Sequence, residues 1–124
     1  MTTMKAIIRE RYGSPDVLKL RDIDRPVIDD YGVLVRVRAA SINAYDWHMM
    51  RGRPALVRVF SGVHKPKSSA MGIDMAGQVE AVGKNVTHFR PGDEVFGARS
   101  GALAEYVSGG PKSFFVPKPA RLSF

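Results

Sequence analysis

Apolar and polar positions alternate most clearly between residues 33 and 39, and this alternation predicts a β-strand. Successive side chains of a strand point to opposite faces, so every second residue shares the same environment. Arg36 and Arg38 fall on one face together with Leu34, and the other face is free of charge. The face that we expect in the core consists of Val33, Val35, Val37 and Ala39.

Shorter apolar runs on both sides of this strand predict more strands and little helix. Short strands at close spacing, separated by turn residues, are typical of a β-barrel or a partly open barrel, so the expected fold is mainly β. The expected elements are strands at 4–9, 17–23 and 33–39, a helical turn at 46–51, a short helix at 56–60, and four or five short strands after residue 69, ending at Val116.

The segment from Gly72 to Gly97 contains glycines at 72, 77, 83, 92 and 97, with short β-branched runs between them. Glycine recurs where a backbone needs positive φ or passes close to another backbone. Residues 83–85, Gly-Lys-Asn, lie between two apolar runs and predict a hairpin turn. Residues 90–93, Arg-Pro-Gly-Asp, predict a second tight turn, because proline presets φ.

The order of residues in 72–97 resembles the signature of the medium-chain dehydrogenase/reductase superfamily: a GHE-type segment, then G-x-V, VG, V, F, GD and V-x-G. The resemblance extends to 4–18, 33–39, 41–47, 104–107 and 117–119, and it is greatest to the zinc-free, quinone-oxidoreductase-like branch. It implies a two-domain NAD(P)H-dependent enzyme of which residues 1–124 are the N-terminal GroES-like domain. The G-x-G-x-x-G loop of a Rossmann domain is absent from these 124 residues.

Zinc binding is not expected, because the ligand positions carry other residues. Zinc-dependent relatives would place a cysteine at Asn43 and a histidine at Ile73, with a glutamate at Asp74. An amide is a poor zinc ligand and isoleucine is none, and the chain has no cysteine. For Asp74 we expect a structural role with an arginine as its partner.

The resemblance assigns catalytic roles to Asn43, Tyr45 and His48, and contacts to the nicotinamide cofactor to Asn43, Asp46, Trp47 and His48. Without a metal, hydrogen-bond donors such as Asn43 and Tyr45 would polarise a carbonyl group, and a histidine can move protons near neutral pH. Structural roles stay open for each residue. Asn43 could brace a turn, Asp46 could cap the short helix, Tyr45 and Trp47 could be packing residues, and His48 could lie on the surface.

The chain carries a net charge of +7, and its stretch from Trp47 to Ile73 contains no acidic residue. This stretch is either a solvated face or a source of positive potential that guides an anionic cofactor or substrate. A missing part of the protein could also offset the charge. The basic residues of the stretch are Arg51, Arg53, Arg58, Lys65 and Lys67.

These observations lead to one functional hypothesis and two alternatives. The hypothesis is an N-terminal catalytic domain of a zinc-independent oxidoreductase that transfers hydride from NADPH or NADH to a quinone, enone or carbonyl compound. The absent domain would hold most of the cofactor. The 124-residue chain alone would therefore be inactive. The alternatives are a free-standing GroES-like binding or assembly module and a basic nucleic-acid-binding barrel. We expect a small-molecule partner rather than nucleic acid or a membrane, with homo-oligomerisation left open. The N-terminal segment lacks a signal-peptide hydrophobic region, so a cytoplasmic location is expected.

Overall fold

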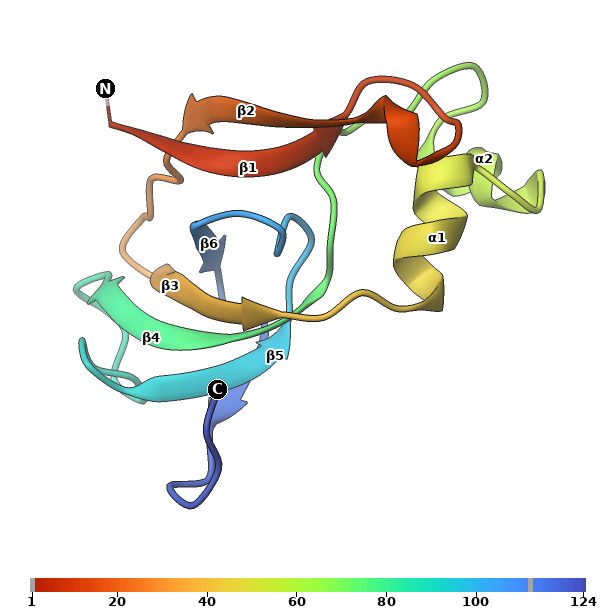
Figure 1. Cartoon of the computed structure of the whole chain (residues 1–124). Helices are drawn as coiled ribbons and strands as arrows, with labels where there is room; N and C mark the ends of the chain where they lie inside the picture. The colour runs from red at the N-terminus through yellow and green to blue at the C-terminus, as the bar shows by residue number, and fades with distance from the viewer. Residues whose placement is uncertain (1, 112) are drawn as a thin grey trace.

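The computed structural model describes residues 2–111 and 113–124, which form two antiparallel sheets (Figure 1). The small sheet pairs β1 (Thr3–Arg9) with β2 (Leu18–Asp24), and a 3-10 turn, Pro15–Val17, precedes β2. The larger sheet has the strand order β6-β3-β4-β5-β7. Its strands are β3 (Val33–Ala40), β4 (Asp74–Val82), β5 (Glu94–Ala98), β6 (Tyr106–Gly109) and β7 (Phe114–Pro117).

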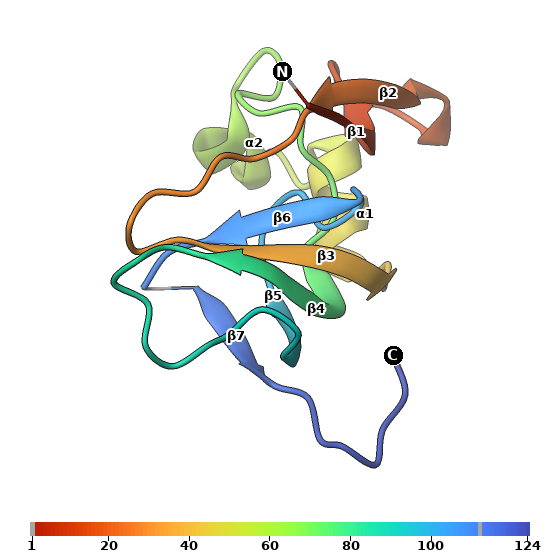
Figure 2. The ribbon, with the colours of Figure 1, turned by 90° about the vertical axis from the view of Figure 1, so that its left-hand side faces the viewer.

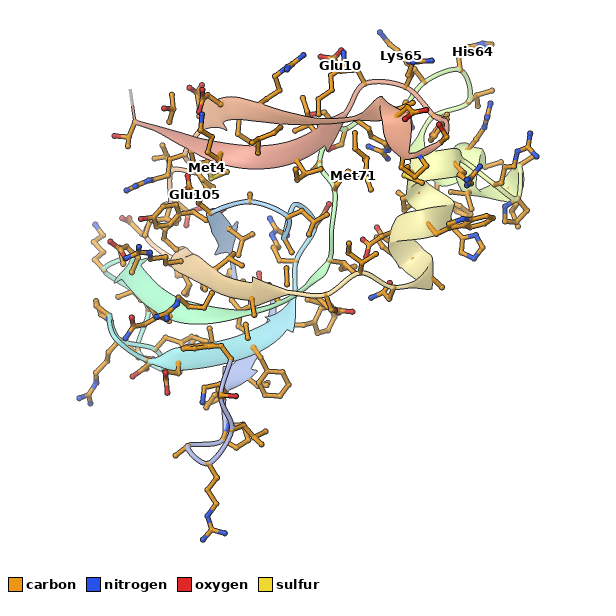
Figure 3. All side chains as sticks on the ribbon, viewed as in Figure 1. Met4, Glu10, His64, Lys65, Met71 and Glu105 are labelled. Carbon is orange, nitrogen blue, oxygen red and sulfur yellow. The ribbon has the colours of Figure 1, made fainter. Side chains whose placement is uncertain are left out.

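The larger sheet curls, and the small sheet lies across its open side (Figures 1 and 2). Backbone contacts join the two: Ile7 N–H donates to the Leu103 carbonyl at 2.8 Å, and isolated bridges link Ala6 to Ala104 and Ile8 to Ala70. Figure 3 shows Met4 and Met71 in the space between β1 and the elements below it, and both side chains are buried. The arrangement confirms the prediction of a mainly β, partly open barrel with short helices.

The core of the larger sheet forms on the face that the alternating pattern predicted, with two differences. Val33 and Val35 are buried, and Val37 packs against the same cluster. Leu34, which falls on the opposite face, is also buried, with 8% of its surface exposed. The β3–β4 register shifts between Leu34 and Val35 and again before Ala39. Val33, Val35 and Val37 still share one cluster that Leu34 does not join, so the alternation holds and the opposite face is covered at Leu34. Ala39, which was expected in the core, is only half-buried and lies outside this cluster.

The two predicted turns have different outcomes. Residues 90–93 form a tight turn, in which Asp93 N–H donates to the Arg90 carbonyl at 3.1 Å. Residues 83–85 also turn, but β4 pairs with β5, which begins only at Glu94, so the predicted hairpin turn is the start of a longer connection. A Cβ atom on Gly83 would collide with the backbone of Asp29 and Asp30. Glycine is therefore needed at position 83 because the backbone of Asp29 and Asp30 passes close to it, and not because of a hairpin turn.

Two short helices, α1 (Ala44–Arg51) and α2 (Leu56–Ser61), lie beside the barrel (Figure 1). The sequence predicted both, although α1 begins two residues earlier than expected. It ends at Gly52, whose φ of 64° is the left-handed conformation that glycine adopts readily. Neither helix, nor any other in residues 2–111 and 113–124, has the length and hydrophobicity to cross a bilayer.

Candidate functional site

The start of α1 is fixed by reciprocal hydrogen bonds between its cap residue and its first turn. Asn43 Oδ1 accepts from the Tyr45 backbone N–H at 2.9 Å, and the Asp46 carboxylate accepts from the Asn43 backbone N–H at 3.0 Å. The first backbone N–H groups of a helix have no partner inside the helix, and this pair of side chains satisfies them. The predicted structural roles of Asn43 and Asp46 as turn brace and helix cap are therefore both realised.

Asn43 also joins the loop after β3 to the first residue of β4. Its Nδ2 donates to an Asp74 carboxylate oxygen. The four ion pairs found in residues 2–111 and 113–124 do not involve Asp74, so the expected arginine partner is wrong, and an amide fills that place. An amide nitrogen has two hydrogens, and one stays free for a further acceptor.

Two charged residues are buried at α1: Asp46, which is part of this cap, and Arg9, which donates to a carbonyl of the helix. Asp46 is 3% exposed, and its Oδ1 has no hydrogen-bond partner among the described residues. Arg9, at the end of β1, is 2% exposed and donates to three carbonyl oxygens, those of Met49 at 3.0 Å, Ser68 at 2.6 Å and Ala70 at 3.3 Å. Burial lowers the pKa of Arg9 below its usual value, because a charged guanidinium is less stable away from water.

Arg9 and Asp46 line one cavity of about 200 Å³ together with Tyr45. Its wall combines apolar side chains with polar groups, as small-molecule sites commonly do. Sequence reasoning missed Arg9, and its position at the end of an apolar run was the one signal available. The other lining residues are Met49, Phe60, Ser61, Lys67, Ser68, Ala70, Met71, Gly72 and Ser100.

Trp47 and His48 are not among the residues that line this cavity. The two rings pack edge to face at 5.0 Å, and Trp47 keeps about half of its surface exposed. His48 Nδ1 lies 2.8 Å from the Arg53 carbonyl oxygen. A carbonyl only accepts, so Nδ1 carries the proton in this contact and Nε2 is the nitrogen with a free lone pair. The structure thus brings Tyr45 and Asp46 together at the cavity and separates Trp47 and His48 from them.

The basic residues of the acid-free stretch are also divided. Lys67 lines the cavity with Tyr45, whereas Arg51, Arg53 and Arg58 line a separate hollow. His64 and Lys65 lie on the loop after α2 (Figure 3). No group of three His, Asp or Glu side chains that could hold a metal ion occurs within the part of the chain that the structure describes.

Residues 29–120 match the family model of the alcohol dehydrogenase GroES-like domain. The chain belongs to this family. Within it, the chain is a member of the quinone-oxidoreductase-like branch of the medium-chain dehydrogenase/reductase superfamily, as its sequence relatives indicate. The motif in residues 72–97 therefore identified the family correctly.

The sequence relatives are oxidoreductases, and each is longer than this chain. Quinone oxidoreductase of Sus scrofa is 35% identical over 98% of the chain, which covers 35% of the relative. A 2-methylene-furan-3-one reductase of Solanum lycopersicum is 35% identical over 98% of the chain and is covered over 32% of its length. The chain thus spans about a third of the length of these relatives.

Solved structures show the same fold. The quinone oxidoreductase of Coxiella burnetii superposes with a TM-score of 0.85 at 30% identity, covering 99% of this chain and 39% of that one. The Escherichia coli quinone oxidoreductase, solved as a complex with NADPH, superposes with a TM-score of 0.79 at 25% identity, covering 97% of this chain and 35% of that one.

Proposed function

We propose that this chain is the N-terminal catalytic domain of a zinc-independent oxidoreductase that uses NADPH or NADH to reduce quinones, enones or carbonyl compounds. The relatives named above support the class of reaction. The observation that carries the proposal is the position of Tyr45, which lines the same cavity as the buried Arg9 and Asp46. This cavity offers apolar surface for an acceptor molecule and polar groups to orient it.

We propose that the nicotinamide part of the cofactor contacts the polar groups at the start of α1, whereas the glycine-rich loop that would hold a dinucleotide is not among these 124 residues. The Asp46 Oδ1 is buried without a partner among the described residues, and a bound group with an N–H or O–H would satisfy it. We assign cofactor contacts to Asn43, Asp46, Trp47 and His48. The cofactor, when bound, supplies the hydride.

The residues of this chain would orient the acceptor and stabilise its developing charge. The donors that we assign to the acceptor oxygen are the Tyr45 hydroxyl, at the cavity, and the free Nδ2 hydrogen of Asn43, which does not itself line the cavity. His48, with Nδ1 donating to the Arg53 carbonyl, keeps Nε2 available as a proton acceptor. We propose it as the proton relay, although it does not line the cavity of Tyr45.

The absence of zinc is supported by what surrounds the two ligand positions. Asn43 already binds the Tyr45 N–H and the Asp74 carboxylate, and Ile73 has no donor atom. A metal would have to break the cap of α1 to reach the Asn43 oxygen. We therefore propose that Asn43 stabilises the start of α1 and has one N–H left to donate to a ligand.

Steady-state kinetics of the parent protein tests the assignment of Tyr45. With NADPH and a simple quinone, Tyr45→Phe removes one donor and should lower kcat about 10- to 1000-fold while KM for NADPH changes little. Tyr31→Phe, at an exposed tyrosine outside the cavity, is the matched control. An unchanged kcat in Tyr45→Phe would contradict the catalytic role of Tyr45 and remove the main support for a functional cavity.

A further inference from the structure

Three arginines surround a hollow of about 300 Å³ that is distinct from the cavity of Tyr45. Arg51 comes from the end of α1, Arg53 from the loop after it, and Arg58 from α2. The opposite wall consists of Tyr12, Gly13 and Ser14, in the turn between β1 and β2. Segments distant in sequence therefore build this hollow, which we call the arginine hollow.

Aromatic and backbone contacts hold two of the guanidinium groups in place. Arg58 lies 4.6 Å from the centre of the Tyr12 ring, and its Nε donates to the Gly52 carbonyl at 3.0 Å. Arg51 lies 5.4 Å from the centre of the Trp47 ring. Stacked guanidinium groups lose less freedom when they bind a ligand than free ones do, so this placement favours binding.

The positive charge of the arginine hollow is not neutralised by the chain. None of the four ion pairs among the described residues involves Arg51, Arg53 or Arg58. An acidic side chain near the wall is that of Asp16, which is exposed and accepts from Ser14 Oγ at 3.3 Å. One exposed carboxylate leaves an excess of positive charge beside three guanidinium groups.

The convergence of three guanidinium groups points to a ligand. They line one hollow, and none of them has an ion-pair partner in residues 2–111 and 113–124. An anion in the arginine hollow would supply the missing acceptors and negative charge. Convergent guanidinium groups suit phosphate in particular, because its several oxygens can accept from more than one arginine at once.

We infer that the arginine hollow is a binding site for the phosphate group of a small molecule, held by Arg51, Arg53 and Arg58. The site is separate from the cavity of Tyr45, and the inference does not rest on the proposed oxidoreductase function. Its volume leaves room for part of the molecule that carries the phosphate. The shared chemistry is the phosphate oxyanion, whether it is a single phosphate or a diphosphate.

The test is an NMR titration of the chain with inorganic phosphate and with pyrophosphate, with acetate as a carboxylate control, all at constant ionic strength. We expect saturable shifts of the side-chain Nε–H signals of the three arginines and of the backbone signals of Gly13 and Ser14. Comparison of phosphate with pyrophosphate shows whether one phosphate or two fill the site. Absence of saturable shifts with both, or equal shifts with acetate, would overturn the inference.

Variants make the test specific to the arginine hollow. Arg53→Gln and Arg51→Gln each remove a charged donor and should weaken binding of the preferred phosphate ion about tenfold or more. Arg36→Gln, at an exposed arginine on β3, is the matched control and should leave the affinity unchanged. The backbone spectrum of each variant reports whether it is folded. Folded Arg53→Gln and Arg51→Gln variants that both bind as tightly as the original chain would also overturn the inference.

Discussion

Asn43 donates a hydrogen bond to the Asp74 carboxylate and so ties the cap of α1 to the first residue of β4. One side chain thus serves the helix and the sheet together, because its oxygen accepts from the Tyr45 N–H. The cavity residues Tyr45 and Asp46 follow directly in the first turn of α1. This amide and the Arg9 bond to the Met49 carbonyl together place them relative to the barrel.

Two substitutions of Asn43 should separate its two contacts. Asn43→Ala removes both and should lower the free energy of unfolding by about 1–3 kcal/mol, as for a lost cap together with a buried hydrogen bond. Asn43→Ser keeps a good cap but loses the amide donor to Asp74, so its loss should be smaller. Urea denaturation followed by circular dichroism measures both, with Asn85→Ala at an exposed position as the control. Equal stability of all three variants and the original chain would show that the link to β4 contributes nothing.

Arg9 should contribute strongly to stability, although none of the four ion pairs in residues 2–111 and 113–124 involves it. Arg9→Met leaves the carbonyls of Met49, Ser68 and Ala70 without their donor, and we expect a loss of about 2–4 kcal/mol. Arg21→Met, at an exposed arginine on β2, should stay within about 0.5 kcal/mol. Thermal and urea unfolding of the two variants give the comparison, and similar values for both would contradict the role assigned to Arg9.

The effect of Arg9 should not depend on pH near neutrality. Burial lowers its pKa in the folded chain, so the folded chain would release this proton at a lower pH than the unfolded chain. Stability linked to this proton rises with pH only between the lowered pKa of Arg9 in the folded chain and the ordinary pKa of an arginine. Below that window both states hold the proton, and the difference between Arg9→Met and the original chain should stay constant from about pH 6 to 8. A difference that changes across this range would mean that another group titrates with Arg9.

Gly77 on β4 should be intolerant of a side chain. A Cβ atom there would collide with the Arg36 carbonyl oxygen and lie 2.9 Å from a Val35 methyl carbon. We expect Gly77→Ala to cost about 1–3 kcal/mol, the usual range for forced overpacking. Gly110→Ala, where a Cβ atom would meet nothing within 4 Å, is the control and should change stability by less than about 0.5 kcal/mol. A Gly77→Ala chain as stable as the control variant would show that β3 and β4 can separate without cost.

The sequence predicted the strands, both short helices and the family, because those depend on local alternation and on the ordered residues of 72–97. It could not place Arg9 at the cavity, since that contact joins β1 to carbonyls at 49, 68 and 70. The expected arginine partner of Asp74 was wrong for the same reason, because nothing local shows which distant side chain faces it. The burial of Leu34 was missed because alternation shows on which face a residue lies, but not whether another part of the chain covers that face.

Purified protein should contain no stoichiometric zinc. The Asn43 amide is engaged on both sides, and Ile73 offers no ligand atom. Elemental analysis after gel filtration, without chelators in any buffer, gives the metal content per chain. One tightly held zinc ion per chain would contradict the assignment of a zinc-independent enzyme.

The central claim is tested most directly by NADPH oxidation with a simple quinone. The rate is measured side by side for the intact parent protein and for the 124-residue chain. We predict turnover by the parent and none by the chain, because the cleft would have one wall here and its nucleotide-binding loop in the other domain. Both proteins should be purified identically, and Tyr45→Phe of the parent serves as the site-specific control. A parent protein that oxidises no NADPH with quinones, enones or carbonyl compounds, or a chain that turns over by itself, would contradict the account.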